Sequence, residues 1–313
     1  GKIKVLPIYY LSEKIRNILV SEGFSEVSLY SLVANGEIET AKPLAKDKAF
    51  ARPTLAHGMR SCVEKNVLNA DLIGLDSIKI FEIGHVFSNA GESIRLAIGA
   101  AQVRKIKGIN GKKIITDTIG LLGKELAVAG LRSPAAVDDK SENSSPVQLL
   151  EKGNIAVCEI DLNELLSVYK LPANATYNDL GFGSASTNLY KKISQYPFIV
   201  RDIAVFVPET VQADEVWSVI ESGINGVGKI GGGSAGAGND TNGIEGKSKN
   251  LDVSALELLV RHALFDTFKK DGKVSYAFRM VFQSMECTLT DDEVAKIMTV
   301  TYSALKGKSW EVR

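Results

Sequence analysis

The sequence predicts an α+β protein of two domains. In the first half, segments with the apolar spacing of amphipathic helices are interspersed with segments in which apolar and polar residues alternate as in strands. A strand that begins at Tyr196 opens a second pattern, because Pro197 cannot donate to a sheet ladder and belongs at the beginning of a strand. From this strand to the end, the order of elements reads β-α-β-β-α-β. We therefore expect a first domain over 1–190 and a second over 195–313.

The first domain is expected to combine a mostly antiparallel sheet with several helices. Ser12 is available as a cap for the first helix, and the polar interval 133–145 is expected to be an exposed loop. The expected helices are 9–23, 57–70, 115–129 and 163–169, and the expected strands are 24–33, 78–87, 94–103 and 154–160.

Composition excludes several classes of protein. The chain has 313 residues, 45% of them hydrophobic and 24% charged, with no formal net charge at pH 7. It is long enough for two domains, and it lacks the overall basic charge that would indicate nucleic-acid binding by electrostatics alone. No apolar run is long enough to span a bilayer, so we expect a cytoplasmic protein without a membrane segment. The chain opens on Gly1, from which we expect a processed or excised piece of something longer.

The histidines, carboxylates and cysteines of the chain predict neither a catalytic residue nor a metal site. Glu82 and His85 are three apart on an expected strand, so their side chains point to opposite faces and cannot share a metal ion. His57 and His85 are each lone and are interpreted as capping or core histidines. The segment 181–183 is glycine-rich but does not complete a phosphate-binding loop. The three scattered cysteines, Cys62, Cys158 and Cys287, predict reduced, buried thiols rather than disulfides.

The second domain is expected to be a ferredoxin-like β-α-β-β-α-β unit. Asp271-Gly272 is a strong hairpin signal, and Thr290 with Glu293 forms a capping-box pattern before the last helix. A glycine-rich insertion at about 231–250 is expected to be flexible, whether it is natural or an engineered spacer. The expected strands are 196–207, 259–268, 274–282 and 310–312, and the expected helices are 210–223 and 291–305.

Short motifs in both domains carry a family resemblance. In the second domain they are Tyr196-Pro197, Arg201-Asp202-Ile203-Ala204, Leu264-Phe265-Asp266, Gly272-Lys273, Phe278-Arg279, Phe282-Gln283-Ser284 and Thr288-Leu289-Thr290-Asp291-Asp292-Glu293-Val294. In the first domain they are Glu22-Gly23-Phe24-x-Glu26-Val27, Pro43-Leu44, Arg52-x-Thr54-Leu55, Asn66 and Phe81-Glu82-Ile83-Gly84-x-Val86-Phe87. Together they resemble the C-terminal part of bacterial-type phenylalanyl-tRNA synthetase beta subunits, where an inactive synthetase-like core precedes a ferredoxin-fold anticodon-binding domain.

The resemblance implies a non-catalytic role within phenylalanine-tRNA ligase. The first domain would be a class II synthetase-like antiparallel domain that docks the catalytic alpha subunit of an α2β2 assembly. The second would help recognise the anticodon of tRNA(Phe) during ATP-dependent aminoacylation. The holoenzyme uses ATP and Mg²⁺, and none is expected to bind this segment. No Gly-x-Gly-x-x-x-Arg-like segment that could clamp ATP is present, and Glu82 stands in a Phe-Glu-Ile-Gly strand without an obvious arginine partner for a triphosphate. The family's editing domain is absent, so editing is not assigned to this chain.

Alternation along the third strand of the second domain indicates where RNA would bind. Its large residues are expected to pack under the helices, while small or polar residues and the outward side of the first strand form an open platform. The expected tRNA-binding residues are Arg201, Asp202, Phe206, Ser275, Ala277 and Arg279. Alternatively, Arg279 pairs with Asp202 across the sheet and Phe206 is an ordinary exposed aromatic residue. Residues 196–313 hold 13 Lys and Arg against 16 Asp and Glu, so most tRNA affinity is expected to come from elsewhere in the assembly.

Two other functions stay open. The chain could be a stand-alone RNA-binding or assembly protein with the same folds, or a regulatory ferredoxin-like module that binds a free amino acid. The sequence shows no dedicated pocket for the latter.

Overall fold

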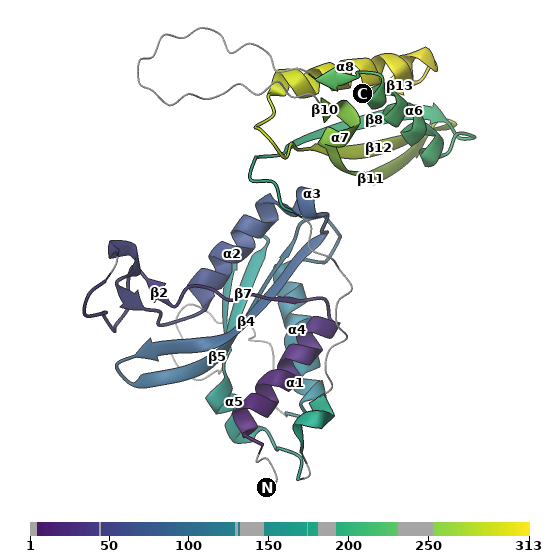
Figure 1. Ribbon diagram of the computed structural model, residues 1–313. Coiled ribbons are helices and arrows are strands. Elements are labelled where there is room, and N and C mark those ends of the chain that lie inside the picture. The colour runs from purple at the N-terminus through teal and green to yellow at the C-terminus, as the bar shows by residue number, and fades with distance from the viewer. Residues whose placement is uncertain are drawn as a thin grey trace, which may run out of the picture. The chain divides into compact units, whose positions relative to one another are not determined.

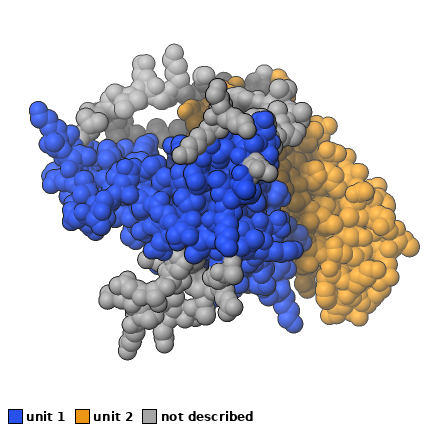
Figure 2. All heavy atoms as spheres, turned by 90° about the horizontal axis from the view of Figure 1, so that it is seen from below, with its two compact units in different colours: residues 1–187 blue, residues 188–313 orange. Residues whose placement is uncertain are grey.

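The chain forms two compact units, residues 1–187 and 188–313, which Figure 2 colours separately. The computed structural model describes residues 5–43, 45–128, 131, 147–173, 175–180, 192–230 and 253–313. The polar interval 133–145, the segment 181–183 and the insertion 231–250 lie outside the described residues.

Unit 1 is built on a five-stranded sheet with the order β1-β4-β5-β7-β6 (Figure 1). Neighbouring strands are antiparallel except for β1 and β4, which are parallel. The strands are β1 (Ser25–Glu26), β4 (Ser77–Ser88), β5 (Gly91–Gln102), β6 (Val147–Lys152) and β7 (Ile155–Asp161), with β2 (Leu32–Val33) and β3 (Phe50–Ala51) pairing separately. The helices are α1 (Pro7–Ser21), α2 (Ala56–Leu68), α3 (Ala70–Ile73), α4 (Gly111–Glu125) and α5 (Leu162–Val168), with short 3₁₀ turns η1 (Lys46–Lys48) and η2 (Tyr177–Leu180).

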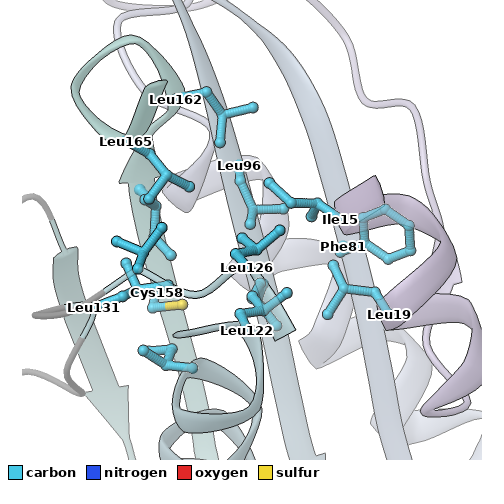
Figure 3. Packing of buried hydrophobic residues seen from close by; sticks show 14 of the residues in the cluster. Ile15, Leu19, Phe81, Leu96, Leu122, Leu126, Leu131, Cys158, Leu162 and Leu165 are labelled. Atoms are coloured by element: carbon cyan, nitrogen blue, oxygen red, sulfur yellow. The ribbon is translucent and has the colours of Figure 1, made fainter. Parts of the chain in front are cut away.

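Helices cover both faces of this sheet because β5 carries apolar residues on both sides. Leu96 and Ile98 pack with α1, α4 and α5, as Figure 3 shows for part of this cluster, while Ala97 and Ala101 pack with α2. Between them, Gly99 allows α2 to approach closely, since a Cβ atom there would lie 2.6 Å from the Val63 side chain. The sheet is therefore the middle layer of unit 1.

The thiols have different environments in the structure. Cys158 lies in the core, and burial raises the pKa of its thiol to about 12. Cys62 and Cys287 are only partly buried, so the expectation of buried thiols holds fully for Cys158 alone.

Two local expectations for unit 1 were wrong, and one strand was missed. Ser12 is buried inside α1, which begins at Pro7 without a side-chain cap; proline at the first helical position already has the helical φ. The expected strand 24–33 is interrupted: only 25–26 and 32–33 are strands, and between them the backbone N–H of Leu29 donates to the Glu82 carboxylate, at 3.3 Å. Strand β6 follows the polar interval directly, and no strand was expected there.

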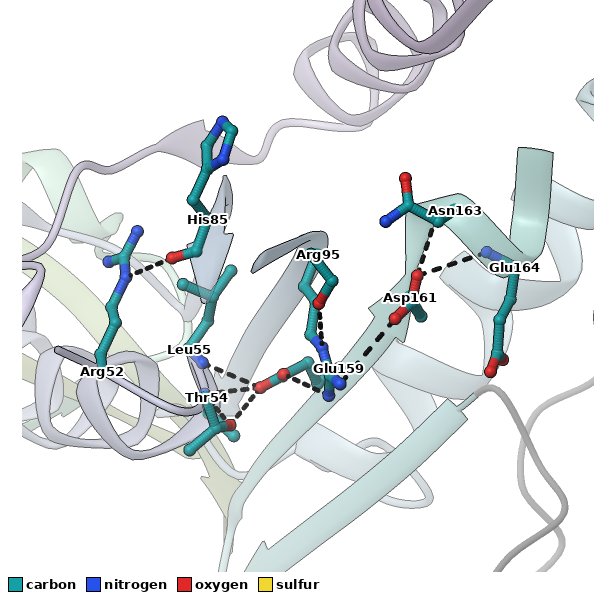
Figure 4. A network of polar contacts seen from close by, with 11 residues as sticks. Arg52, Thr54, Leu55, His85, Arg95, Glu159, Asp161, Asn163 and Glu164 are labelled. Atoms are coloured by element: carbon teal, nitrogen blue, oxygen red, sulfur yellow. Dashed lines mark hydrogen bonds and ion pairs between the residues drawn. The ribbon is translucent and has the colours of Figure 1, made fainter. Parts of the chain in front are cut away.

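Arginine and glutamate side chains from distant segments form the polar contacts of unit 1 drawn in Figure 4. Glu159 on β7 is 2% exposed and accepts from the backbone N–H groups of Leu55, at 3.0 Å, and Ala56, at 2.9 Å, which caps α2. Its other oxygen lies 3.0 Å from Arg95 Nη1. A carboxylate from the sheet thus satisfies the first N–H groups of the helix that packs on it.

Glu82 forms a buried ion pair with an arginine from a distant segment. Arg52 Nη1 lies 2.8 Å from Glu82 Oε1, and both side chains are buried. Arg52 also donates through Nε to the carbonyl of His85, at 2.9 Å. Arg52 lies thirty residues away from Glu82 along the chain, on a loop that folds back against β4. His85 itself points to the solvent and contacts Glu92.

Unit 2 confirms the ferredoxin-like arrangement. Its four-stranded sheet has the order β11-β12-β8-β13, with antiparallel neighbours, and α6 and α8 share one hydrophobic core with it. The elements are β8 (Ile199–Pro208), α6 (Ala213–Asn225), β11 (Leu259–Lys270), β12 (Lys273–Phe282), α8 (Asp291–Gly307) and β13 (Glu311–Val312). The sequence missed a small antiparallel pair, β9 (Lys229–Ile230) with β10 (Val253–Ser254), and the following turn of helix α7 (Ala255–Leu258).

The turn and cap signals of unit 2 are confirmed. Asp271 and Gly272 have φ angles of 52° and 74°, as a two-residue turn of type I′ requires. The Thr290 hydroxyl accepts from the backbone N–H of Glu293, at 3.3 Å, and the Glu293 carboxylate accepts from the backbone N–H of Thr290, at 2.8 Å. Both signals act locally, which is why they can be read from the sequence.

Replacing Thr290 by alanine is expected to lower the stability of unit 2 by about 1 kcal/mol, because the first turn of α8 loses its cap. The measurement is hydrogen exchange of unit 2 amides at increasing urea concentration. Thr288→Ala, at an exposed position just before the helix, is the control. Equal stability of the two variants would contradict the capping role.

Replacing Arg52 by methionine is expected to lower the stability of unit 1 by about 3–5 kcal/mol, because it leaves Glu82 charged and buried without its partner. The double variant Arg52→Met with Glu82→Leu is expected to recover most of the loss. Hydrogen exchange of unit 1 amides measures both. Arg16→Met removes a partly exposed pair with Glu26 and should cost about 1 kcal/mol or less. A loss at Arg52 no larger than that at Arg16 would rule out a stabilising role for the buried pair.

Candidate nucleic-acid interface

Strand register defines the candidate surface, which we call the outer face: the side of the unit 2 sheet opposite α6 and α8. On β8, Ile203, Val205 and Val207 belong to the core, so the residues between them face outward. The residue pairing between neighbouring strands extends this assignment from β8 to β12, β11 and β13. The outer face comprises Val200, Asp202, Ala204, Phe206, Pro208, Arg261, Ala263, Asp266, Phe268, Lys270, Lys273, Ser275, Ala277, Arg279, Val281 and Glu311.

The structure brings five of the six residues predicted from the sequence together on the outer face: Asp202, Phe206, Ser275, Ala277 and Arg279. Arg201 is not among them. Because successive side chains of β8 point to opposite faces, Arg201 lies on the helix side of the sheet. There its Nη2 pairs with the carboxylate of Asp291 at the start of α8.

Arg279 and Asp202 form a two-point ion pair across β12 and β8. The Nε–Oδ1 and Nη2–Oδ2 distances are both 2.8 Å, and the guanidinium also lies over the Phe265 ring, 5.0 Å from its centroid. This is the contact that the alternative interpretation of the sequence describes. It fixes the orientation of the guanidinium, since a bidentate pair with a carboxylate constrains the plane as well as the distance.

Three phenylalanine rings belong to this region of the sheet, two more than the sequence identified. Phe206 lies under the Arg313 guanidinium, 5.4 Å from the ring centroid, and Phe268 is 54% exposed. The sequence analysis assigned no face to Phe265 or Phe268, and a β-bulge between Leu264 and Asp266 shifts the alternation along β11.

The effect of the bulge can be followed on either side of it. Before the bulge, His262 stacks on Trp217 of α6 with ring centroids 3.7 Å apart, so even-numbered residues face the helices there. Burial lowers the pKa of this histidine. After the bulge, Asp266 pairs with Ala277 and Phe268 with Ser275, so even-numbered residues face outward. Strict alternation would have assigned Phe268 to the wrong face.

Charges in unit 2 are separated between the two sides of the sheet. Among the described residues, the outer face holds the basic residues Arg261, Lys270, Lys273 and Arg279, joined by Arg313 over Phe206, against the acidic residues Asp202, Asp266 and Glu311. The sequences of α6 and α8 carry six acidic and two basic residues. The outer face is therefore net basic, although residues 196–313 as a whole are net acidic.

Two family models match this chain. Residues 3–124 match the phenylalanyl tRNA synthetase beta chain CLM domain, and residues 247–313 match the ferredoxin-fold anticodon binding domain. The second match includes β11, β12, α8 and β13, and thus most of the outer face.

Curated relatives are similar over most of the chain. A phenylalanine–tRNA ligase beta subunit from Syntrophus aciditrophicus is 24% identical over 92% of the chain, and one from Moorella thermoacetica is 26% identical over 93%. A third, from Trichormus variabilis, is 25% identical over 95%. The chain spans about a third of the length of these relatives, 36% in each case.

Similarity to solved structures is low. A histidyl-tRNA synthetase from Nostoc sp. PCC 7120 gives a TM-score of 0.30 at 11% identity, covering 41% of this chain and 34% of the other. An asparaginyl-tRNA synthetase from Pyrococcus horikoshii gives 0.23 at 15% identity, covering 39% and 29%. TM-scores of this size do not establish a shared fold.

The resemblance predicted from the sequence motifs is confirmed by the matches to both domains and to the curated relatives. The chain is similar to phenylalanine–tRNA ligase beta subunits, and it joins a region that matches the phenylalanyl tRNA synthetase beta chain CLM domain to a region that matches the ferredoxin-fold anticodon binding domain.

Proposed function

We propose that the chain is the non-catalytic part of a phenylalanine-tRNA ligase beta subunit, in which unit 2 contacts the anticodon of tRNA(Phe) and unit 1 docks the catalytic alpha subunit. The observation that carries the proposal is the outer face, which combines aromatic rings and a basic excess and lies mostly within the region that matches an anticodon-binding domain. The assembly would be an α2β2 heterotetramer of the cytoplasm that charges tRNA at the expense of ATP.

Recognition of single-stranded RNA uses the two kinds of group that the outer face offers. Unpaired bases stack on aromatic rings, and phosphates contact lysine and arginine. We propose that Phe206, Ser275 and Ala277 lie under the bases, with Asp202 and Arg279 at one side as a rigid polar pair. Arg201, which pairs with Asp291 on the helix side, would act only indirectly, by holding β8 against α8.

A non-catalytic role for unit 1 is supported by the ion pairs that two of its arginines form. Adenylation needs cationic groups that clamp the phosphates of ATP. In unit 1, Arg52 is engaged by Glu82, and Arg95 is engaged by Glu159 and Asp161. Within the described ranges, no three histidine, cysteine or acidic side chains gather as a metal site would require. We propose that ATP and Mg²⁺ bind the alpha subunit, and that unit 1 has a class II synthetase-like fold.

A stand-alone RNA-binding or assembly protein would use the same outer face without a ligase. The two functions differ in one requirement, a catalytic partner.

No helix among the described residues has both the length and the apolar character needed to cross a bilayer.

Co-expression with the catalytic alpha subunit from the same genome is expected to yield a stable complex with this chain. Unit 1 carries exposed apolar side chains, such as Leu68 and Tyr9, that a partner could cover. Affinity purification followed by size-exclusion chromatography measures the complex, and a catalytic alpha subunit from a different ligase is the control. RNA binding without any alpha-subunit binding would support the stand-alone function instead.

Changing Lys270 and Lys273 to glutamine is expected to weaken RNA binding and flatten its salt dependence, because the two lysines lie opposite each other at one end of the outer face. If both contact phosphates, the slope of log K against log salt should fall by about 1.4. Fluorescence anisotropy with an anticodon stem-loop RNA measures the slope. The control is the double change of Lys296 and Lys306 on α8, on the opposite side of the sheet. An equal effect of the two double variants would contradict RNA binding at the outer face.

A further inference from the structure

The loop that follows β2 contains an Asn35-Gly36 pair, the dipeptide in which an asparagine side chain most readily reacts with its own main chain. Glycine has no side chain to shield its nitrogen, and it adopts conformations that bring this nitrogen close to the preceding side chain. Three such pairs lie among the described residues: Asn35-Gly36, Asn110-Gly111 and Asn225-Gly226. A fourth, Asn242-Gly243, lies outside them.

Hydrogen bonds hold two of the three described pairs. Asn225 lies at the end of α6, and the Gly226 N–H donates to the Ser222 carbonyl, at 2.9 Å. Asn110 caps α4 through its Oδ1 atom, which accepts from the Lys113 N–H at 2.8 Å. In each of these pairs, either the asparagine side chain or the glycine nitrogen must leave a hydrogen bond before the two can react.

Asn35 lacks both kinds of protection. Its side chain is exposed, and within the described part of the chain neither its amide group nor the Gly36 N–H has a hydrogen-bond partner. The strands beside it are short, since β2 and β3 have two residues each and pair only with each other. Local opening of so small a ribbon needs little free energy, which lets the loop reach the reactive conformation.

The reaction at Asn35 needs only water as a co-reactant. The Gly36 nitrogen attacks Cγ of Asn35, and the new N–Cγ bond replaces the Cγ–Nδ2 bond. Nδ2 leaves as ammonia and takes the proton of the Gly36 N–H. Water then opens the cyclic imide at one of its two carbonyl carbons. Opening at Cγ gives aspartate, and opening at the main-chain carbonyl gives isoaspartate, in which the chain runs through the former side chain.

We propose that Asn35 is a site of spontaneous deamidation in the folded protein, and that its isoaspartate product loosens the β2–β3 ribbon. The chain is anchored on both sides of this residue. Before it, Leu32 and Val33 pair with β3, and after it, the Ile38 carbonyl accepts from the Ala51 N–H at 2.8 Å. Isoaspartate lengthens the main chain between these anchors by one carbon atom, so they no longer fit the loop.

The modification also adds a charge to a cavity of unit 1. Asn35 and Gly36 line a cavity of about 480 Å³. Arg52 and His57 line the same cavity, so the product carboxylate shares it with a guanidinium. Close packing explains why glycine follows Asn35, because a Cβ atom at Gly36 would lie 2.5 Å from the Ala51 carbonyl oxygen. The same constraint therefore keeps the reactive pair in place.

The test follows deamidation of the full chain in mildly alkaline buffer by peptide mapping and mass spectrometry. Incubation in heavy-oxygen water marks the reactions that occur during it. Asn35 is expected to react at least about tenfold faster than Asn110 and Asn225, because these two must first break a hydrogen bond or open a helix. In strong denaturant the three should react at similar rates, since each precedes glycine. A folded-state rate at Asn35 no higher than at the other two would overturn the site.

Two variants separate the chemistry from its effect on the ribbon. Asn35→Gln should not react on the same time scale, because its longer side chain must close a larger ring. Asn35→Asp carries the product charge without the extra main-chain atom. Hydrogen exchange at Ala51 should be at least about fivefold faster in the isoaspartate form, as loss of one hydrogen bond predicts, and near the unmodified rate in both variants. Equal exchange in the isoaspartate form and in both variants would overturn the loosening of the ribbon.

Discussion

The antiparallel register between β8 and β12 is the constraint on which the candidate interface depends. Because side chains alternate with a period of two, the pairing that buries Ile203 and Phe278 in the core also places Phe206 beside Ser275 on the opposite face. A shift by one residue would exchange the two faces, exposing the core and burying charge. The hydrophobic core thus enforces the arrangement of the surface, and the hairpin at Asp271 and Gly272 fixes where β12 begins to pair with β11.

Separation of charge explains how a net acidic unit can present a basic surface. The acidic residues of α6 and α8 lie on one side of the sheet, and Arg261, Lys270, Lys273 and Arg279 lie on the other. At physiological ionic strength the screening length is about 8 Å, so charges separated by a packed layer of about 10 Å interact only weakly through solvent. An RNA phosphate near the outer face therefore responds mainly to the charges of that face, among which basic residues outnumber Asp202, Asp266 and Glu311.

Unit 1 uses its buried charges to join distant segments. Glu159 on β7 caps α2, and Arg52 holds Glu82 while it also donates to the β4 backbone at His85. Each buried carboxylate meets an arginine, and removal of either partner would leave a charge without compensation. The same pairing engages Arg52 and Arg95, two cationic side chains that could otherwise contact a phosphate.

The sequence by itself determined the α+β composition, the β-α-β-β-α-β order, the turn at Asp271, the cap at Thr290 and the outward position of Phe206, because each depends on residues close together along the chain. Only the tertiary structure decided the partner of Glu82, the position of Arg201 on the helix side and the outward position of Phe268. The first two are pairings between distant segments, which packing selects. The third follows from a bulge in β11, where one extra residue reverses the alternation that sequence reading assumes.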